Sequence, residues 1–128
     1  MKNKFWIVIA SLLLVYLAYD HFSTPDGVSQ ISAGELEELI ASDGDHYFLD
    51  VRETHEFAES HVAGMTNIPL SVLTDQLDQL PDDRELVIFC RSGNRSMQAA
   101  EILQSEGFEQ LTNVRGGMNA WNGETVTP

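Results

Sequence analysis

The sequence predicts an α/β domain in which helices cover both faces of a parallel sheet. Two observations support this fold class: short apolar segments alternate with helical patterns along the chain, and the run LVIF before Cys90 is apolar at every position. Alternating elements indicate βαβ units, and a continuous apolar run is typical of a strand buried on both faces. The chain of 128 residues is long enough for one domain and not for two.

Five segments have the composition of strands. They are residues 28–31, 47–51, 64–70, 85–89 and 111–114. We expect Pro69 to end the third strand, because proline has no N–H to donate to a sheet. In open parallel sheets, sites form at the carboxyl ends of the strands. The residues that directly follow these segments are therefore the first candidates for a functional site.

Helical patterns lie between the strands. Ser32 and Glu35 form a capping box before the apolar residues Leu36, Leu39 and Ile40, an arrangement that begins a helix. The other expected features are a turn at Asp43–Gly44, a short helix capped by Thr54, a helix from Ser71 to Leu80 closed by Pro81, a helix running to Glu106 with Gly107 as left-handed cap, and a short helix over residues 118–121.

The N-terminal segment is apolar after a basic start. Residues 5–19 carry no charge and follow Lys2 and Lys4. As a helix they would span roughly 22 Å, compared with about 30 Å for the hydrocarbon core of a membrane. Aromatic residues mark both ends of the stretch, and no small-x-small cleavage site follows it.

We expect residues 1–22 to be a retained membrane anchor, with residues 5–22 in the inner membrane. A cleaved signal segment and a buried helix of the domain are the alternatives. Residues 23–27 are then a linker, and residues 28–128 form the domain. Lysines lie before the apolar stretch and none follow it, which predicts a domain outside the cytoplasm, in the periplasm of a Gram-negative cell.

Charge is distributed unevenly along the chain. All twenty carboxylates lie at or after Asp20, where only five arginines oppose them. Such an acidic surface excludes nucleic acid as a partner. Four of the arginines lie in or beside segments that follow strands: Arg52, Arg91, Arg95 and Arg115. We therefore expect the positive potential to gather at one place, where it would attract small anions.

Cys90 is the only cysteine, so an internal disulfide and a zinc site built on several cysteines are excluded. His55 and His61 lack the spacing of a metal-binding helix, and we expect neither a metal nor a cofactor. The polar loop CRSGNRS and a helix start follow the cysteine. Loop N–H groups, a helix N-terminus and two arginines favour a nucleophilic thiolate. The alternative is that Cys90 simply fills the core.

Four motifs occur in order along the chain: LDVRE at 49–53, EFAESHVAGMTNIPL at 56–70, CRSGNRS at 90–96 and VRGGMNAW at 114–121. With this order and spacing, residues 31–121 resemble the single-domain rhodaneses, which are thiosulfate sulfurtransferase-like proteins. The resemblance implies a three-layer fold, in which helices flank both faces of a five-stranded parallel sheet.

The resemblance also implies the chemistry. Cys90 would be the catalytic nucleophile: it would take the outer sulfur of thiosulfate or a related anionic donor as a persulfide and pass it to cyanide or a thiol. The loop that would bind the substrate comprises Arg91, Ser92, Gly93, Asn94, Arg95 and Ser96. Candidate supporting residues are Asp50 and Arg52, which we expect to pair with each other or brace loops, Arg115, and Trp121, which would shape the core or line the pocket entrance.

Two other functions remain open. Dual-specificity phosphatases and arsenate reductases have a related fold and use Cys-x5-Arg, whereas Cys90 and Arg95 are spaced as Cys-x4-Arg. Phe89 also stands where a phosphatase usually has histidine. The spacing therefore favours sulfur over phosphate. The second alternative is a non-turnover persulfide carrier or sulfur-relay module that passes its sulfur to a partner protein.

Overall fold

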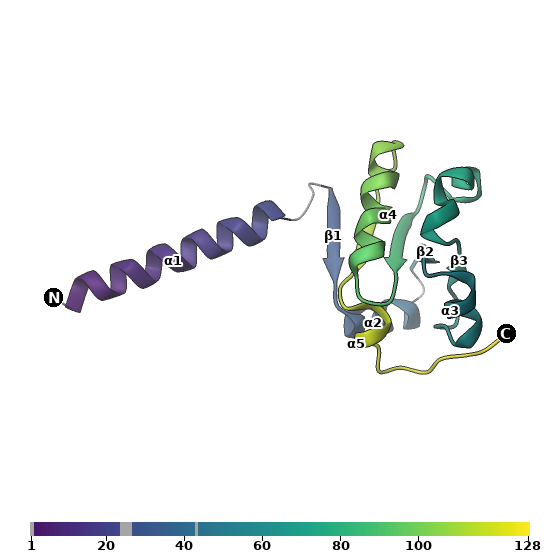
Figure 1. Cartoon of the computed structure of the whole chain (residues 1–128), viewed down its shortest axis with the longest axis horizontal. Helices are drawn as coiled ribbons and strands as arrows, with labels where there is room; N and C mark the ends of the chain where they lie inside the picture. Colours follow the sequence, from purple (N-terminus) through teal and green to yellow (C-terminus); the bar gives the residue numbers. More distant parts are fainter. Residues whose placement is uncertain (1, 24–26, 43) are drawn as a thin grey trace.

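The computed structural model describes residues 2–23, 27–42 and 44–128. Its centre is a five-stranded sheet in the order β1-β5-β4-β2-β3, in which every neighbouring pair is parallel (Figure 1). This topology confirms the predicted fold class. The strands are β1 (Val28–Ile31), β2 (His46–Asp50), β3 (Thr66–Asn67), β4 (Glu85–Phe89) and β5 (Leu111–Val114).

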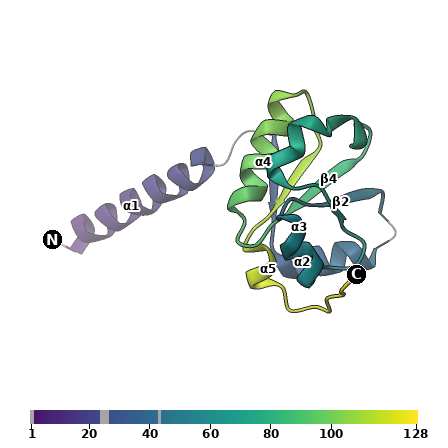
Figure 2. The same cartoon turned by 45° about the vertical axis from the view of Figure 1, so that its right-hand side comes forward.

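Helices cover both faces of the sheet. Figure 2 shows α2, α3 and α5 gathered on one side, with α4 on the other. The two 3-10 helices, η1 and η2, pack on the α4 side. The bounds of these elements are α2 (Ala33–Ala41), α3 (Thr54–Glu59), η1 (Leu70–Asp75), η2 (Leu77–Gln79), α4 (Asn94–Ser105) and α5 (Gly117–Ala120).

The central strand β4 separates the two hydrophobic clusters of the core. Leu86, Ile88 and Cys90 belong to the cluster beneath α4, whereas Val87 and Phe89 belong to the cluster beneath α2, α3 and α5. This division follows from the two-residue period of a strand, which points successive side chains to opposite faces. The apolar run before Cys90 is therefore buried on both faces, as its composition predicted.

The expected strand over residues 64–70 is shorter in the structure and covers only Thr66–Asn67. The N–H groups of Ile68 and Leu70 still donate to the carbonyls of Asp50 and Val51, on either side of Pro69. Because β3 is an edge strand, the missing N–H of Pro69 costs no bond to its neighbour. The helix expected from Ser71 to Leu80 is instead the pair η1 and η2, held by bonds between residues three apart.

Other local predictions have mixed outcomes. The capping box of Ser32 and Glu35 is confirmed, and so is the left-handed Gly107, with φ of 96°. The cap of α3 is Glu53 rather than Thr54, which is already the first helical residue. The predicted turn at Asp43–Gly44 and the linker over 23–27 include residues outside the described part of the chain.

Helix α1 (Lys2–Ser23) extends away from the domain, and its large apolar side chains between Phe5 and Leu17 are exposed (Figure 1). Within the described residues, no helix has both the length and the apolar composition needed to cross a membrane. The predicted anchor over residues 5–22 is therefore not supported: its charge-free stretch ends at Tyr19, well short of a hydrocarbon core. A location outside the cytoplasm stays a prediction.

Candidate active site

Cys90 lies immediately after β4, at the carboxyl edge of the sheet. The strands on either side of β4 are β2 and β5, and Arg52 and Arg115 follow these two strands. All three residues therefore lie at one edge, as the order of elements predicted. The side chain of Cys90 is fully buried against the α4 face, so its neighbours are fixed by the packing of the core.

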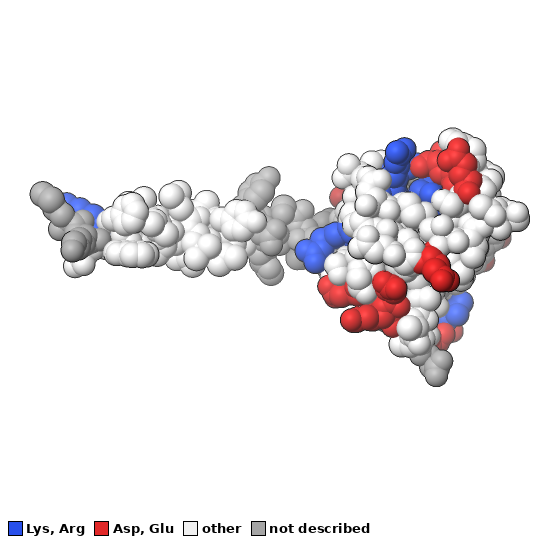
Figure 3. All heavy atoms as spheres, turned by 90° about the horizontal axis from the view of Figure 1, so that it is seen from below, with Lys and Arg blue, Asp and Glu red and all other residues white. Residues whose placement is uncertain are grey.

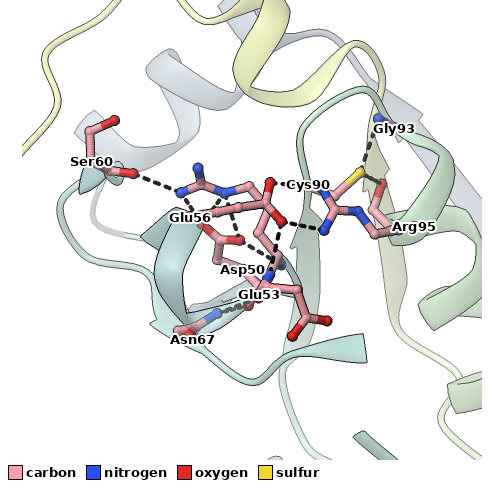
Figure 4. A network of polar contacts seen from close by, with 10 residues as sticks. Asp50, Glu53, Glu56, Ser60, Asn67, Cys90, Gly93 and Arg95 are labelled. Carbon is pink, nitrogen blue, oxygen red and sulfur yellow. Dashed lines mark hydrogen bonds and ion pairs between the residues drawn. The ribbon is translucent and has the colours of Figure 1, made fainter. Parts of the chain in front are cut away.

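The sulfur of Cys90 is held by two polar contacts (Figure 4). The backbone N–H of Gly93 donates to Sγ over 3.0 Å, and the thiol lies 3.3 Å from the hydroxyl oxygen of the buried Ser96. When the sulfur is a thiolate, that hydroxyl can rotate and donate to it. The helix α4 begins directly after Gly93, so its positive end also faces the sulfur. These groups would stabilise an anion on Cys90.

Two glycines give the loop its shape. Gly93 has φ of 102°, a left-handed conformation that brings its N–H to the sulfur. A Cβ on Gly117 would lie 2.1 Å from the carbonyl oxygen of Cys90, so only glycine allows α5 to approach this closely. From that position, the N–H groups of Met118 and Asn119 donate to the carbonyls of Cys90 and Arg91, each over 2.9 Å. The motif after β5 therefore fixes the start of the cysteine loop.

Arg95 is bound to Glu56 of α3. Its two terminal nitrogens donate to the two carboxylate oxygens over 2.6 and 2.9 Å, a bidentate pair. The hydrogen bonds from Arg95 lower the pKa of Glu56 to about 2, despite some desolvation. Glu56 in turn raises the pKa of Arg95, and a negative charge on Cys90 adds to this effect. The pair is therefore ionised at neutral pH.

A second, more deeply buried pair braces the same edge. The guanidinium of Arg52 donates to both oxygens of Asp50, with Nη2 at 2.8 Å, and to the carbonyl of Ser60. The amide of Asn67 donates to the carbonyls of Asp50 and Arg52. Asp50 is fully buried and Arg52 almost so. These contacts show the pairing and loop bracing that we expected from the sequence.

A small pocket of about 230 Å³ lies beside the cysteine loop. Arg91 is exposed at its wall, and no ion pair of Arg91 is found among the described residues. Ser92 and Asn94, at the tip of the loop, are also exposed. The pocket is lined by Arg52, Glu56, Glu59, Ser60, Arg91, Met118 and Asn119.

The charges at this edge correct one expectation. We expected the arginines to concentrate positive potential beside Cys90, but Arg52 and Arg95 each have a carboxylate partner. On the face of the domain seen in Figure 3, several groups of acidic side chains are accompanied by separate basic ones. Arg91 is the arginine of the loop that keeps an exposed side chain at the pocket.

Trp121 lies away from this pocket. It packs in the cluster beneath α2 and α5, and its indole N–H donates to the carbonyl of Glu124. It lines a larger pocket of about 570 Å³, formed by α2 and residues 62–63 and 121–124, and no residue of the cysteine loop lines this pocket. Trp121 thus packs against the core and is not among the residues that line the pocket beside the cysteine loop. Arg115 is exposed, and its backbone N–H donates to the carbonyl of Ile31.

Glu56 is a site residue that was not predicted from the sequence. Glu56 opens the motif EFAESHVAGMTNIPL, which carried the family resemblance but gave this residue no role. No spacing rule in the sequence connects it to Arg95, which lies 39 positions later. Within the described residues, no group of three or more His, Cys, Asp and Glu side chains could hold a metal ion.

The chain belongs to the rhodanese-like domain family, whose model matches residues 32–124. The Bacillus subtilis protein YtwF, named as a proposed sulfurtransferase, is 40% identical over 98 residues, which are 77% of this chain and 94% of the relative. A sulfurtransferase of Allochromatium vinosum is 33% identical over 94 residues, covering 73% of this chain and 88% of the relative. The relatives thus include sulfurtransferases.

Solved structures of the family have the same fold. A rhodanese-like domain protein from Staphylococcus aureus superposes with a TM-score of 0.73 and 28% identity, covering 78% of this chain and 98% of that structure. A rhodanese-related protein from Thermoplasma volcanium gives a TM-score of 0.69 and 32% identity, covering 78% and 99%. The match spans nearly the whole domain that follows α1.

Proposed function

We propose that this protein is a sulfurtransferase that moves a sulfane sulfur from thiosulfate or a related donor to cyanide or a thiol, through a persulfide on Cys90. The observation that carries the proposal is the setting of the sulfur at the end of the central strand: the Gly93 N–H donates to Sγ over 3.0 Å, and the Ser96 hydroxyl is in contact with it. The sulfurtransferase relatives support the same chemistry.

The first half-reaction loads the cysteine. The Cys90 thiolate attacks the outer sulfur of thiosulfate, a new S–S bond forms, and the S–S bond of the donor breaks. The electron pair of the broken bond leaves with sulfite, and the persulfide anion remains on Cys90. The Gly93 N–H and the positive end of α4 stabilise the anion before and after this step.

The second half-reaction unloads the cysteine. Cyanide attacks the terminal sulfur of the persulfide, the S–S bond to Cys90 breaks, and thiocyanate leaves while the thiolate is restored. A thiol acceptor reacts in the same way as its thiolate and becomes a persulfide. Because the intermediate is covalent and returns the enzyme to its starting form, the cycle needs no cofactor.

Steady-state transfer from thiosulfate to cyanide by the full chain tests this proposal, with thiocyanate as the measured product. We expect Cys90→Ser to abolish turnover, because serine cannot form the persulfide. Glu101→Gln, on the exposed face of α4, is the control and should retain the wild-type rate. A Cys90→Ser variant with full activity would refute the mechanism, and robust hydrolysis of aryl phosphates by the wild type would favour the phosphatase alternative.

A persulfide carrier is the second candidate, and one relative favours it. The Bacillus subtilis protein YrkF, named as a proposed sulfur carrier, is 35% identical over 98 residues, although this chain spans only 53% of its length. A carrier would load one sulfur on Cys90 and release it only to a partner protein. Loading without turnover toward cyanide or small thiols would select this function over the enzyme.

A further inference from the structure

Glu56 accepts hydrogen bonds from both terminal nitrogens of the Arg95 guanidinium, a face that could otherwise bind an anionic donor. The two side chains share two hydrogen bonds, and Figure 4 shows Arg95 reaching from the cysteine loop to the carboxylate. Arg95 directly precedes Ser96, which contacts the sulfur. Arg95 therefore belongs to the segment around the reacting sulfur, but its charge is already neutralised by a carboxylate.

The carboxylate of Glu56 is held in place from its own helix as well. Its Oε1 accepts a hydrogen bond from the backbone N–H of Glu53 over 3.2 Å, within the capping box that begins α3. Its side chain is 17% exposed, compared with 29% for that of Arg95. Because Glu56 is fixed by the helix start, a donor anion must displace a preorganised partner to reach Arg95.

The pocket beside the cysteine loop has little unpaired positive charge with which to bind a dianionic donor. The guanidinium of Arg52 is also occupied, because it pairs with Asp50 and donates to the carbonyl of Ser60. The other charged residues that line the pocket are the exposed Arg91 and the carboxylates Glu56 and Glu59 of α3, of which Glu56 is paired with Arg95. Thiosulfate would bring two negative charges beside these carboxylates, whereas an organic persulfide, R–S–SH, carries no sulfonate and at most one negative charge and so meets weaker repulsion.

We propose that Glu56 is a specificity-determining positioning residue, which keeps Arg95 away from the donor and thereby favours organic persulfides over thiosulfate. This inference rests on the sulfur-transfer function proposed above. With a persulfide donor, the Cys90 thiolate attacks the outer sulfur, the donor S–S bond breaks, and the electron pair leaves with the R–S thiolate. The proton of the persulfide stays on the transferred sulfur, so neither an oxidant nor a reductant is required.

The test measures loading of Cys90 in a single turnover of the full chain, by rapid quenching and mass spectrometry. The two donors are thiosulfate and 2-hydroxyethyl persulfide, whose organic part is uncharged. We expect Glu56→Gln to raise the second-order loading rate from thiosulfate about tenfold, because a freed guanidinium can bind the sulfonate. The rate from the persulfide should stay within about twofold of wild type.

Three further variants make the result specific. Glu101→Gln changes the net charge equally on the exposed face of α4 and should leave both rates within about twofold of wild type. The double variant Glu56→Gln with Arg95→Gln should lose the gain, because the gain requires the freed guanidinium. Glu56→Ala should show the same gain and provides a second route if the glutamine variant does not fold, since alanine is tolerated well within a helix.

The proposal is overturned if both folded Glu56 variants keep the wild-type ratio of the two rates, or if the gain persists without Arg95. A merely structural Glu56 would lower both rates together and leave their ratio unchanged. If the proposed sulfur-transfer function itself is wrong, the result differs: the wild-type chain would take up no sulfur on Cys90 from either donor.

Discussion

The Asp50–Arg52 pair and the Glu56–Arg95 pair lie at the same edge of the sheet and differ in burial. The side chains of the first pair are 0% and 5% exposed, and those of the second are 17% and 29% exposed. The first pair is joined to backbone carbonyls of neighbouring loops, whereas the second joins α3 to the loop that holds Cys90.

This difference separates two roles for one kind of interaction. A buried charge that loses its partner is strongly destabilising, so the Asp50–Arg52 pair is required for the fold. A partly exposed pair contributes little to stability and is free to serve the chemistry of the site. The degree of burial therefore distinguishes the structural pair Asp50–Arg52 from the positioning pair Glu56–Arg95.

The largest effect is expected at the buried brace. Arg52→Ala would leave Asp50 buried without a partner and should lower the free energy of unfolding by about 3–5 kcal/mol. Urea denaturation measures this loss. Arg84→Ala is the control, because Arg84 and the exposed Asp45 are 3.5 Å apart at the surface, and it should cost less than about 1 kcal/mol. Similar losses in both variants would mean that burial does not separate the pairs.

Gly93→Ala should give the next largest effect. Alanine disfavours φ of 102°, and its Cβ would lie 3.2 Å from the backbone nitrogen of Gly116. We expect a cost of about 1–3 kcal/mol and a large loss of sulfur transfer, because the N–H that binds Sγ is displaced.

Gly107→Ala isolates the effect of backbone strain. Gly107 has a similar φ of 96°, but a Cβ there would meet nothing within 4 Å. It should lower the melting temperature and leave sulfur transfer unchanged. If both glycine variants kept full activity, the geometry of the Gly93 N–H would not matter for the chemistry.

Glu56→Gln tests how much the partly exposed Glu56–Arg95 pair contributes to the free energy of unfolding, and how that contribution changes with pH. The pKa of Glu56 is lowered from 4.5 to about 2, chiefly by Arg95. The stabilisation is therefore present above pH 4.5 and is lost as the pH falls toward 2 and below. We expect the variant to lose about 1 kcal/mol or less at neutral pH and to approach wild type in acid. A constant difference across this pH range would contradict the ionised pair.

The smallest effect on stability is expected at Arg91. Arg91→Gln should change the free energy of unfolding by less than about 0.5 kcal/mol, because the side chain is exposed. It should nevertheless slow loading from thiosulfate and weaken the dependence of that rate on ionic strength. Unchanged salt dependence would show that Arg91 does not attract the donor.

The fold was predictable from local pattern to a large extent. The buried run before Cys90 and the alternation of elements indicated the parallel sheet, and the structure confirms it. Less was predictable for residues 64–80, where β3 covers only two residues and bonds between residues three apart replace a regular helix. The predicted membrane anchor is not supported, since no helix among the described residues is long and apolar enough to cross a membrane.

The side-chain contacts of the site were predictable only between residues close in sequence, although the order of the elements also predicted the edge of the sheet at which they lie. Cys90, Gly93 and Ser96 belong to one short segment, and the structure brings them together. The Glu56–Arg95 contact depends on how α3 packs against the loop, which a single sequence does not record. The approach of Gly117 to the carbonyl of Cys90 likewise required the tertiary structure.

The most direct measurement of the central claim is the intact mass of the full chain after reaction with a sulfane sulfur donor. We predict that the chain gains one sulfur atom, that fragmentation locates it on Cys90, and that cyanide removes it with release of an equal amount of thiocyanate. The Cys90→Ser variant should gain none. A wild-type chain whose mass is unchanged after both thiosulfate and an organic persulfide, or a sulfur that loads equally on the Cys90→Ser variant, would contradict the account.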